Sequence, residues 1–237
     1  MTEPLYDGVS AAELAQQLGL PVVVYETVTS TLDVAHEHAG RGTTGPMLIL
    51  ADTQTAGRGR SGHHWSSPAN TGIWLTLLTQ STGRAALDVL SLRVGLCAAH
   101  ALDPFTAEPI QLKWPNDLYV AGRKLAGTLV EARWRQDIPE WVAIGFGVNV
   151  TPPSDQPGAI GLDVGTRRLD VLPTLITELC AAATAQGPLT QDELEEFNAR
   201  DLARGKYCLE PARGYVRGIT PAGELVVELA DATIKIR

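Results

Sequence analysis

A loop that alternates glycine with arginine carries the clearest chemical signal in the sequence. Residues 57–60 read Gly-Arg-Gly-Arg, and the chain continues through Ser61, Gly62 and two histidines to Trp65. Glycine allows positive φ and close approach of backbone amides to a ligand, while arginine presents a permanent, fork-shaped charge that suits phosphate or carboxylate. The loop lacks the Gly-Lys-Ser/Thr end of a P-loop and the three-glycine Rossmann pattern. Taken alone, it fits an anion site, a solvated surface loop or an RNA-binding segment equally well.

A second polar cluster narrows these alternatives. The run 113–117 reads Lys-Trp-Pro-Asn-Asp at the end of a predicted strand, and Lys124 follows directly before the apolar strand predicted from residue 125. A carboxylate and an amide beside a lysine are the groups that Mg²⁺ and phosphate oxygens require. Two lysines held near the Gly/Arg loop would stabilise charge that develops on a phosphate under nucleophilic attack. Together the two clusters favour phosphate chemistry over a solvated surface.

The composition excludes several other kinds of protein. The chain has 237 residues and a formal net charge of −8 at pH 7, which argues against a general nucleic-acid binder. No run approaches the roughly 20 apolar residues that span a bilayer, and residues 1–10 lack the pattern of a signal peptide. Cys97, Cys180 and Cys208 are widely separated and form neither a disulfide framework nor a CxxC metal pattern. We therefore expect a cytoplasmic protein that does not bind membranes.

Hydrophobic periodicity predicts the helices and strands that would position these side chains. Helices are expected at residues 10–18, 29–39, 85–102, 170–185 and 191–202, with capping boxes at Ser10/Glu13 and Thr190/Glu193. Strands are expected at 20–25, 46–51, 71–79, 110–114, 118–120, 125–132 and 141–150. Short strands after Gly205 predict a small β-barrel-like module that needs to dock on the core. The absence of a regular βαβ alternation favours an α+β fold.

Three blocks along the chain together resemble the catalytic core of biotin protein ligases. They are GRGRSGHHW from residue 57, KWPNDLYVAGRKLAGTLVEAR from residue 113 and IGFGVNV from residue 144. The resemblance runs from about Val22 to the C-terminus. It implies a mixed β-sheet catalytic core flanked by helices over residues 1–203, and a small C-terminal SH3-like β-barrel module over residues 204–237.

The resemblance also implies a two-step reaction. Biotin and MgATP would first give biotinoyl-5′-AMP and pyrophosphate. The biotinoyl group would then pass to one lysine of a biotin carboxyl carrier protein, such as an acetyl-CoA carboxylase subunit. ATP and Mg²⁺ are thus the implied cofactors, and biotin is a substrate.

Site residues can be carried over position by position. Biotin contacts would come from Ser30, Thr31, Gln54, Gly57, Arg58, Gly59, Arg60, Lys124 and Gly127. Contacts to ATP or the adenylate would come from Arg58, Arg60, Trp65, Lys113, Asn116 and Asn149, with Asp117 on the metal side. The implied catalytic residues are Lys124, Arg60 and Lys113, and Trp74 is a further aromatic position that would line the pocket.

Three positions depart from the family pattern. Leu32 stands where the family usually has an asparagine after its Ser-Thr pair. His63 replaces the second arginine of the pattern Arg-x-Gly-Arg-x-Trp, and histidine carries only part of arginine's charge near neutral pH. The chain also ends at Arg237, a little before the usual final segment of the module.

Two other functions fit part of the pattern. A lipoate-protein ligase also forms an acyl-adenylate, although it resembles the Lys-Trp-Pro-Asn-Asp block and the Gly/Arg loop only loosely. A non-catalytic RNA- or nucleotide-binding module would use the loop without the second cluster. Some relatives begin with a helix-turn-helix domain, but the stretch before Leu20 is too short for one, so we expect no DNA binding. Both a monomer and a homodimer through exposed strand edges remain open.

Overall fold

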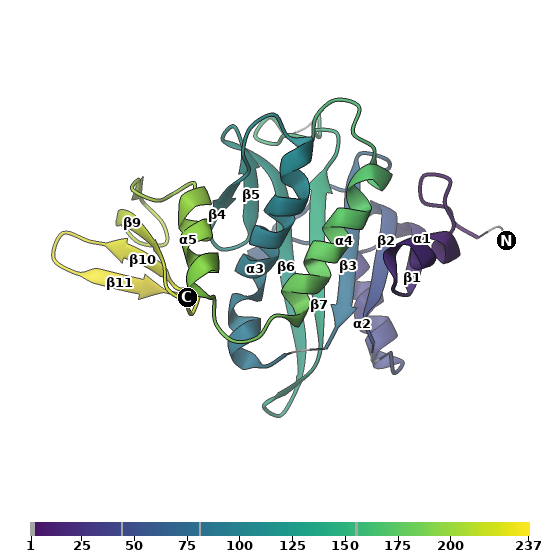
Figure 1. The fold of residues 1–237 in the computed structure, drawn as a ribbon, viewed down its shortest axis with the longest axis horizontal. Helices are drawn as coiled ribbons and strands as arrows, with labels where there is room; N and C mark the ends of the chain where they lie inside the picture. The colour runs from purple at the N-terminus through teal and green to yellow at the C-terminus, as the bar shows by residue number, and fades with distance from the viewer. Residues whose placement is uncertain (1–2, 44, 81, 155) are drawn as a thin grey trace.

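Seven strands form a mixed sheet through the centre of the molecule (Figure 1). They are β1 (Val22–Val28), β2 (Met47–Gln54), β3 (Gly72–Thr79), β4 (Gln111–Lys113), β5 (Asp117–Val120), β6 (Arg123–Arg135) and β7 (Ile138–Asn149). Their order is β1-β2-β3-β7-β6-β5-β4; β1 and β2 are parallel, and the other neighbouring pairs are antiparallel. The structure, a computed structural model, describes residues 3–43, 45–80, 82–154 and 156–237.

Helices cover both faces of this sheet. On one face α3 (Arg84–Leu102) and α4 (Arg168–Thr184) pack side by side, in front of the sheet in Figure 1, and α1 (Ala11–Leu18) packs against β1 and α4. On the other face α2 (Thr31–Gly40) packs on β2, β3 and β7. The last helix, α5 (Gln191–Arg200), lies beside α3 and β4. This arrangement confirms the predicted α+β fold with a mixed sheet flanked by helices.

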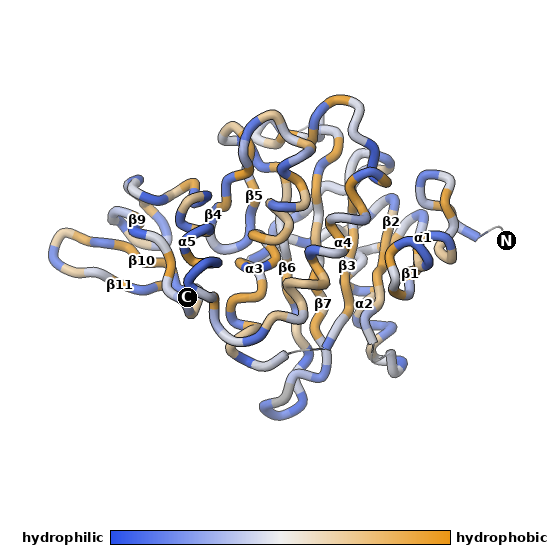
Figure 2. The backbone as a smooth tube through the Cα atoms, in the orientation of Figure 1, coloured by the Kyte–Doolittle hydropathy of each residue, from blue (hydrophilic) through white to orange (hydrophobic). Residues whose placement is uncertain are grey.

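The two faces bury apolar clusters of different size. The larger cluster lies between the sheet and α3 and α4, where the central strands are orange along most of their length in Figure 2. The smaller cluster lies under α2 and consists of Leu32, Ala35, Ala39, Ile49, Leu78 and Ala143. Because β3 is covered on both faces, seven of its eight residues are buried, which explains its nearly continuous apolar sequence.

Serine side chains cap the first two helices, at the predicted Ser10 and at Ser30. The Ser10 side chain accepts a hydrogen bond from the Glu13 amide, and the Glu13 carboxylate accepts one from the Ser10 amide, which completes a capping box for α1. Gly19 ends that helix with φ of 71°. In α2 the cap is Ser30, whose hydroxyl accepts from the Leu32 amide at 3.3 Å. The helix therefore begins at Thr31.

The long apolar helix α3 is a core helix. By length and composition, Arg84–Phe105 could cross a bilayer, but 67% of its most apolar window is buried inside the protein. Its neighbours are α4, α5 and strands β4 to β6. Burial in the protein accounts for its composition, because a helix surrounded by protein is apolar on most sides.

The C-terminal strands form a second, antiparallel sheet. They are β8 (Tyr207–Cys208), β9 (Gly214–Ile219), β10 (Leu225–Glu228) and β11 (Thr233–Ile236), in the order β11-β10-β9-β8. Val216 and Val227 belong to the main apolar cluster, and Trp114 Nε1 donates to the Gly223 carbonyl at 3.0 Å. The tail is thus docked on the core, as expected. The pairs among the described residues leave β8 and β11 as edges, and the domain boundary at residues 203/204 remains a prediction.

Candidate active site

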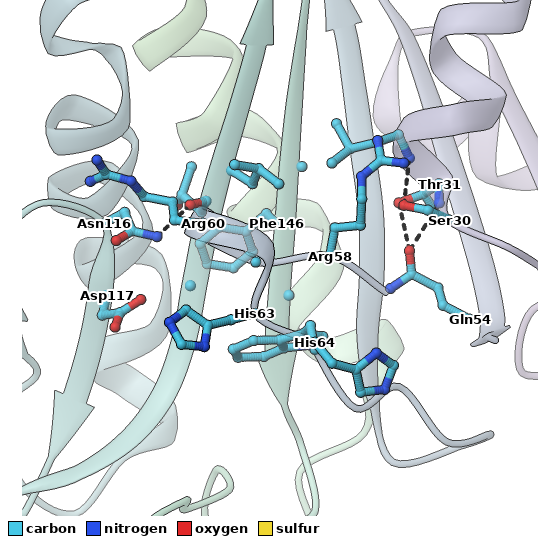
Figure 3. A pocket seen from close by; sticks show the side chains of 18 of the residues that line it. Ser30, Thr31, Gln54, Arg58, Arg60, His63, His64, Asn116, Asp117 and Phe146 are labelled. Carbon is cyan, nitrogen blue, oxygen red and sulfur yellow. Dashed lines mark hydrogen bonds between the residues drawn. The ribbon is translucent and has the colours of Figure 1, made fainter. Parts of the chain in front are cut away.

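A cavity of about 200 Å³ lies where the start of α2, the Gly/Arg loop and strands β5 to β7 meet (Figure 3). It brings together most of the predicted site residues, although they lie far apart in the sequence. Those that line it are Ser30, Thr31, Gln54, Arg58, Gly59, Arg60, Trp65, Asn116, Asp117, Lys124 and Gly127.

One end of the cavity is rich in hydrogen-bonding groups. Gln54 Oε1 accepts from the Thr31 amide at 2.9 Å and from the Thr31 hydroxyl at 3.2 Å. Gln54 Nε2 donates to Ser67 Oγ at 2.8 Å, and Thr76 Oγ1 donates to Thr31 Oγ1 at 2.9 Å. This chain of bonds holds the start of α2 against the end of β2. It fixes the orientation of polar groups around Ser30, which is also the helix cap.

Glycines on two paired strands form the floor of the cavity, where the absence of side chains leaves space. Gly127 on β6 pairs with Gly147 on β7, and Gly145 lies on the same face two residues away. A Cβ at Gly147 would lie 2.7 Å from Trp65 Nε1, and a Cβ at Gly145 would lie 3.0 Å from Leu32 Cδ1. The missing side chains therefore leave room for the Trp65 indole and for Leu32. Leu32, one of the departures from the family pattern, forms an apolar part of the wall.

Lys124 lies among an acid, an aromatic ring and the cavity. Its Nζ is 2.7 Å from Asp117 Oδ1 and 5.2 Å from the centre of the Trp65 ring. An ammonium group has three N–H donors, so the contact to Asp117 leaves donors for an anion in the cavity. Trp65 packs edge-on against Trp74, and its Nε1–H has no hydrogen-bond partner within the described residues. Lys124 thus has donors available to a bound ligand, whereas Trp65 Nε1 is buried against the strand at Gly147.

The Gly/Arg loop folds back on itself beside this lysine. The Trp65 amide donates to the Gly57 carbonyl at 2.9 Å, and the Gly59 amide donates to the His63 carbonyl at 2.7 Å. Gly57 is required by this close approach, since a Cβ there would lie 2.4 Å from the Trp65 carbonyl oxygen. The turn between them places Arg60, His63 and His64 at the wall of the cavity.

Arg60 stands between two hollows. Besides the cavity described above, Arg60 lines a neighbouring one of about 440 Å³, bounded by α3, β6 and the turn at Gly223. Asn116 also lines both, and its Nδ2 donates to the Thr128 carbonyl at 2.8 Å. In Figure 3 these two residues lie at the opposite end of the view from Thr31 and Gln54.

Four predicted residues lie outside the cavity lining. Lys113 is exposed, with its Nζ 5.4 Å from the centre of the Tyr119 ring. Asn149 is buried, and its Nδ2 donates to the Ile160 carbonyl at 3.2 Å. Gly57 and Trp74 shape the loop and support Trp65, respectively. Their predicted ligand contacts remain predictions.

Several lining residues were not among the predicted site residues. They are His64, Leu75, Thr128, Leu129, Gly145, Phe146 and Gly147. Most fall inside the three sequence blocks, so the blocks themselves were the available signal. Leu75 had none, because a leucine in an apolar strand looks the same whether it faces a cavity or the core.

Comparison with known proteins identifies the family. The model of the Biotin/lipoate A/B protein ligase family matches residues 24–149, more than half of the chain. The chain belongs to this family. It is 30% identical over 236 residues to the biotin–acetyl-CoA-carboxylase ligase of Mycobacterium tuberculosis, covering 90% of this chain and 85% of that protein.

Other relatives extend the comparison. The bifunctional ligase/repressor BirA of Escherichia coli is 37% identical over 138 residues, which cover 58% of this chain and 43% of that protein. The chain spans less than half the length of the first curated relatives it matches. Among solved structures, the biotin protein ligase from Aquifex aeolicus in complex with biotin and ATP superposes with a TM-score of 0.75 at 23% identity. That match covers 91% of this chain and 94% of the other, and it shows a shared fold.

Proposed function

We propose that this protein is an ATP-dependent biotin protein ligase. It would activate biotin as biotinoyl-5′-AMP and then transfer the biotinoyl group to a lysine of a biotin carboxyl carrier protein. The relatives named as biotin ligases support this function, as does the bound biotin and ATP named for the similar Aquifex aeolicus structure.

The observation that carries the proposal is the sequence of polar, apolar and positively charged groups along one cavity. Hydrogen-bonding groups of Ser30, Thr31 and Gln54 occupy one end, where they can bind the ureido ring of biotin. The glycine floor and the Trp65 indole suit an apolar chain. Arg58, Arg60 and Lys124 supply positive charge for a carboxylate and a phosphate.

In the first step the biotin carboxylate is itself the nucleophile, so the protein needs no serine, cysteine or histidine nucleophile. A carboxylate oxygen bonds to the α-phosphorus of ATP, and the bond between the α-phosphorus and the bridging oxygen breaks to release pyrophosphate. The two reactants are both anions, and their repulsion must be offset. Lys124 and the two arginines offset it while the cavity walls hold the reactants together.

In the second step the neutral amine of the carrier lysine attacks the acyl carbon, and AMP leaves as the amide forms. The mixed anhydride is sensitive to water, so a loop folded beside the cavity would protect it. Mg²⁺ would neutralise part of the phosphate charge. No group of three or more His, Cys, Asp or Glu within the described residues could hold a metal. An ion that arrives on ATP phosphates needs one or two carboxylates, and Asp117 fits that role.

A lipoate-protein ligase, the alternative function, would use the same adenylate chemistry, but its substrate carries a dithiolane ring in place of the ureido ring of biotin. A dithiolane ring offers no N–H or carbonyl group to the Ser30, Thr31 and Gln54 end of the cavity. Thr31 and Gln54 already bond each other and their neighbours, so a dithiolane ring would forgo only the bonds that a ureido ring could form with the remaining groups, such as the Ser30 hydroxyl proton.

We also propose that the protein is cytoplasmic. All three cysteines are free, and this supports a reducing compartment.

One experiment separates the candidate functions. The chain is incubated with ATP and either biotin or lipoate, and the products are analysed by mass spectrometry. We expect biotinoyl-AMP and pyrophosphate from biotin. An adenylate formed from lipoate alone would select the lipoate-protein ligase, and no adenylate from either acid would favour a nucleotide- or RNA-binding module. Adding a carrier domain then tests the transfer by the mass of the modified lysine.

A further inference from the structure

The guanidinium of Arg58 is held by two carboxylates from different elements. One terminal nitrogen donates to Asp33 in the first turn of α2, and the other lies 3.2 Å from Glu131 Oε2 and 3.3 Å from Glu131 Oε1 on β6. Partial burial alone would lower the pKa of Arg58, but the hydrogen bonds and charges of these carboxylates outweigh it and raise the pKa. These contacts leave further N–H groups of the fork for a ligand.

Glu131 is in turn held by a histidine. His36 Nε2 lies 2.6 Å from Glu131 Oε2, although the two residues are 95 positions apart in the sequence. On its other side, His36 Nδ1 accepts a hydrogen bond from Trp141 Nε1 at 3.0 Å. An indole N–H can only donate, so Nδ1 carries no proton and Nε2 must be the protonated nitrogen. His36 therefore donates to Glu131 through Nε2.

The resulting chain of contacts links four elements. It runs from Trp141 on β7 through His36 on α2 and Glu131 on β6 to Arg58 in the Gly/Arg loop. The side chains of His36 and Glu131 are 30% and 33% exposed, so water screens this chain only partly. Neither His36 nor Trp141 lines the cavity, whereas Arg58 does. These contacts can therefore influence the cavity only through the position of the Arg58 side chain.

We propose that His36 and Glu131 are positioning residues of the ligase, which set the orientation of the Arg58 guanidinium toward the bound anion. The inference rests on the proposed function, because it assigns Arg58 to the acyl ligand. His36 fixes the carboxylate of Glu131, and Glu131 together with Asp33 fixes the fork. A guanidinium held in this way loses less conformational freedom when it binds a carboxylate or phosphate.

Substitutions at His36 separate hydrogen bonding from packing. His36→Phe keeps an aromatic ring but removes both nitrogens, whereas His36→Gln retains one donor and one acceptor without a titratable group. Glu131→Gln removes the charge that faces Arg58 and keeps the shape. The matched control is Glu37→Gln, since Glu37 is the next residue of α2 and pairs with Arg41 on the exposed surface.

Steady-state adenylate formation and limited digestion supply two independent readouts. We expect His36→Phe and Glu131→Gln to raise the KM for biotin by about tenfold to a hundredfold, as for one lost hydrogen bond to a charged group, with a smaller change in kcat. We expect His36→Gln to stay within about threefold of wild type and Glu37→Gln to match it. Trypsin should cleave after Arg58 faster in His36→Phe than in wild type or His36→Gln, as measured by the peptide that ends there.

The outcomes distinguish the two proposals. A wild-type chain that forms no biotinoyl-AMP would overturn the proposed function and the positioning role with it. An active wild type with His36→Phe equally active and equally resistant to trypsin would overturn the positioning role alone, as would His36→Gln impaired as strongly as His36→Phe. Thermal unfolding checks that each variant folds, and if His36→Phe does not, the contrast between Glu131→Gln and Glu37→Gln decides.

Discussion

At the scale of single residues, the two lysines of the predicted site, Lys124 and Lys113, differ in their position relative to the cavity. Lys124 lines the cavity and holds Asp117, whereas Lys113 is exposed and lies outside the lining. We predict that Lys124→Gln lowers the rate of biotinoyl-AMP formation by about 10²- to 10³-fold, the range seen when one group that stabilises transition-state charge is removed. Lys113→Gln should lower this rate less than tenfold, because the exposed Lys113 lies outside the cavity lining and so stabilises the transition-state charge less. Single-turnover measurement of pyrophosphate release tests both, and equal losses would contradict the distinction.

A second residue-scale prediction concerns the glycine floor. Gly147→Ala would place a methyl group 2.7 Å from Trp65 Nε1 and 2.8 Å from Cε2, so the indole would have to shift. We expect biotin affinity, measured by isothermal titration, to fall by at least about tenfold, because the cavity wall moves. Gly40→Ala is the matched control, since a Cβ there meets no atom within 4 Å and the position closes α2. The control should bind biotin normally; weakened binding there would count against a local effect at Gly147.

At the scale of elements, the first turn of α2 serves both stability and the site. Ser30 and Ser10 are both N-caps, but Ser30 also lines the cavity. We predict that Ser30→Ala and Ser10→Ala each lower the free energy of unfolding by about 1 kcal/mol, the usual value of a cap. Only Ser30→Ala should weaken biotin binding. Urea unfolding and titration calorimetry on the same preparations test this, and normal binding by Ser30→Ala would remove the serine from the proposed biotin site.

The periodic patterns predicted the elements themselves well. Capping boxes at Ser10/Glu13 and Thr190/Glu193 are present, because caps depend on neighbours within one helical turn. Element ends were less accurate: β2 was expected to end at residue 51 but extends to Gln54, and β6 extends to Arg135. Those extensions depend on pairing with neighbouring strands, which a local pattern does not contain.

At the scale of the whole molecule, one buried arginine ties distant segments together. Arg168, at the start of α4, is 4% exposed and forms ion pairs with Asp7 near the N-terminus and Asp52 on β2. Its guanidinium also lies 4.2 Å from the centre of the Tyr6 ring. The contact joins the N-terminal segment, the sheet and α4 near the end of the strand that carries Gln54.

We predict that Arg168→Ala lowers the free energy of unfolding by about 2–4 kcal/mol. Removing one partner of a buried ion pair costs roughly 3–5 kcal/mol, and the partial exposure of the two carboxylates reduces that cost. The midpoint of urea unfolding should fall while its slope stays constant. Arg167→Ala is the control, because the exposed Arg167 pairs with Asp170 within one helical turn, and it should leave the midpoint unchanged. Equal effects of both changes would contradict the role of Arg168 in joining the N-terminal segment, the sheet and α4.

The sequence by itself determined the helices and most strands, the two polar clusters and the family pattern, because these depend on residue type and short spacing. Only the tertiary structure decided which side chains meet. It excluded Lys113 and Asn149 from the cavity lining, opposed Gly127 to Gly147 across two strands, and brought His36 to Glu131. The physical reason is that such contacts follow from strand order and register. These are set by burial over the whole sheet rather than by any local run of residues.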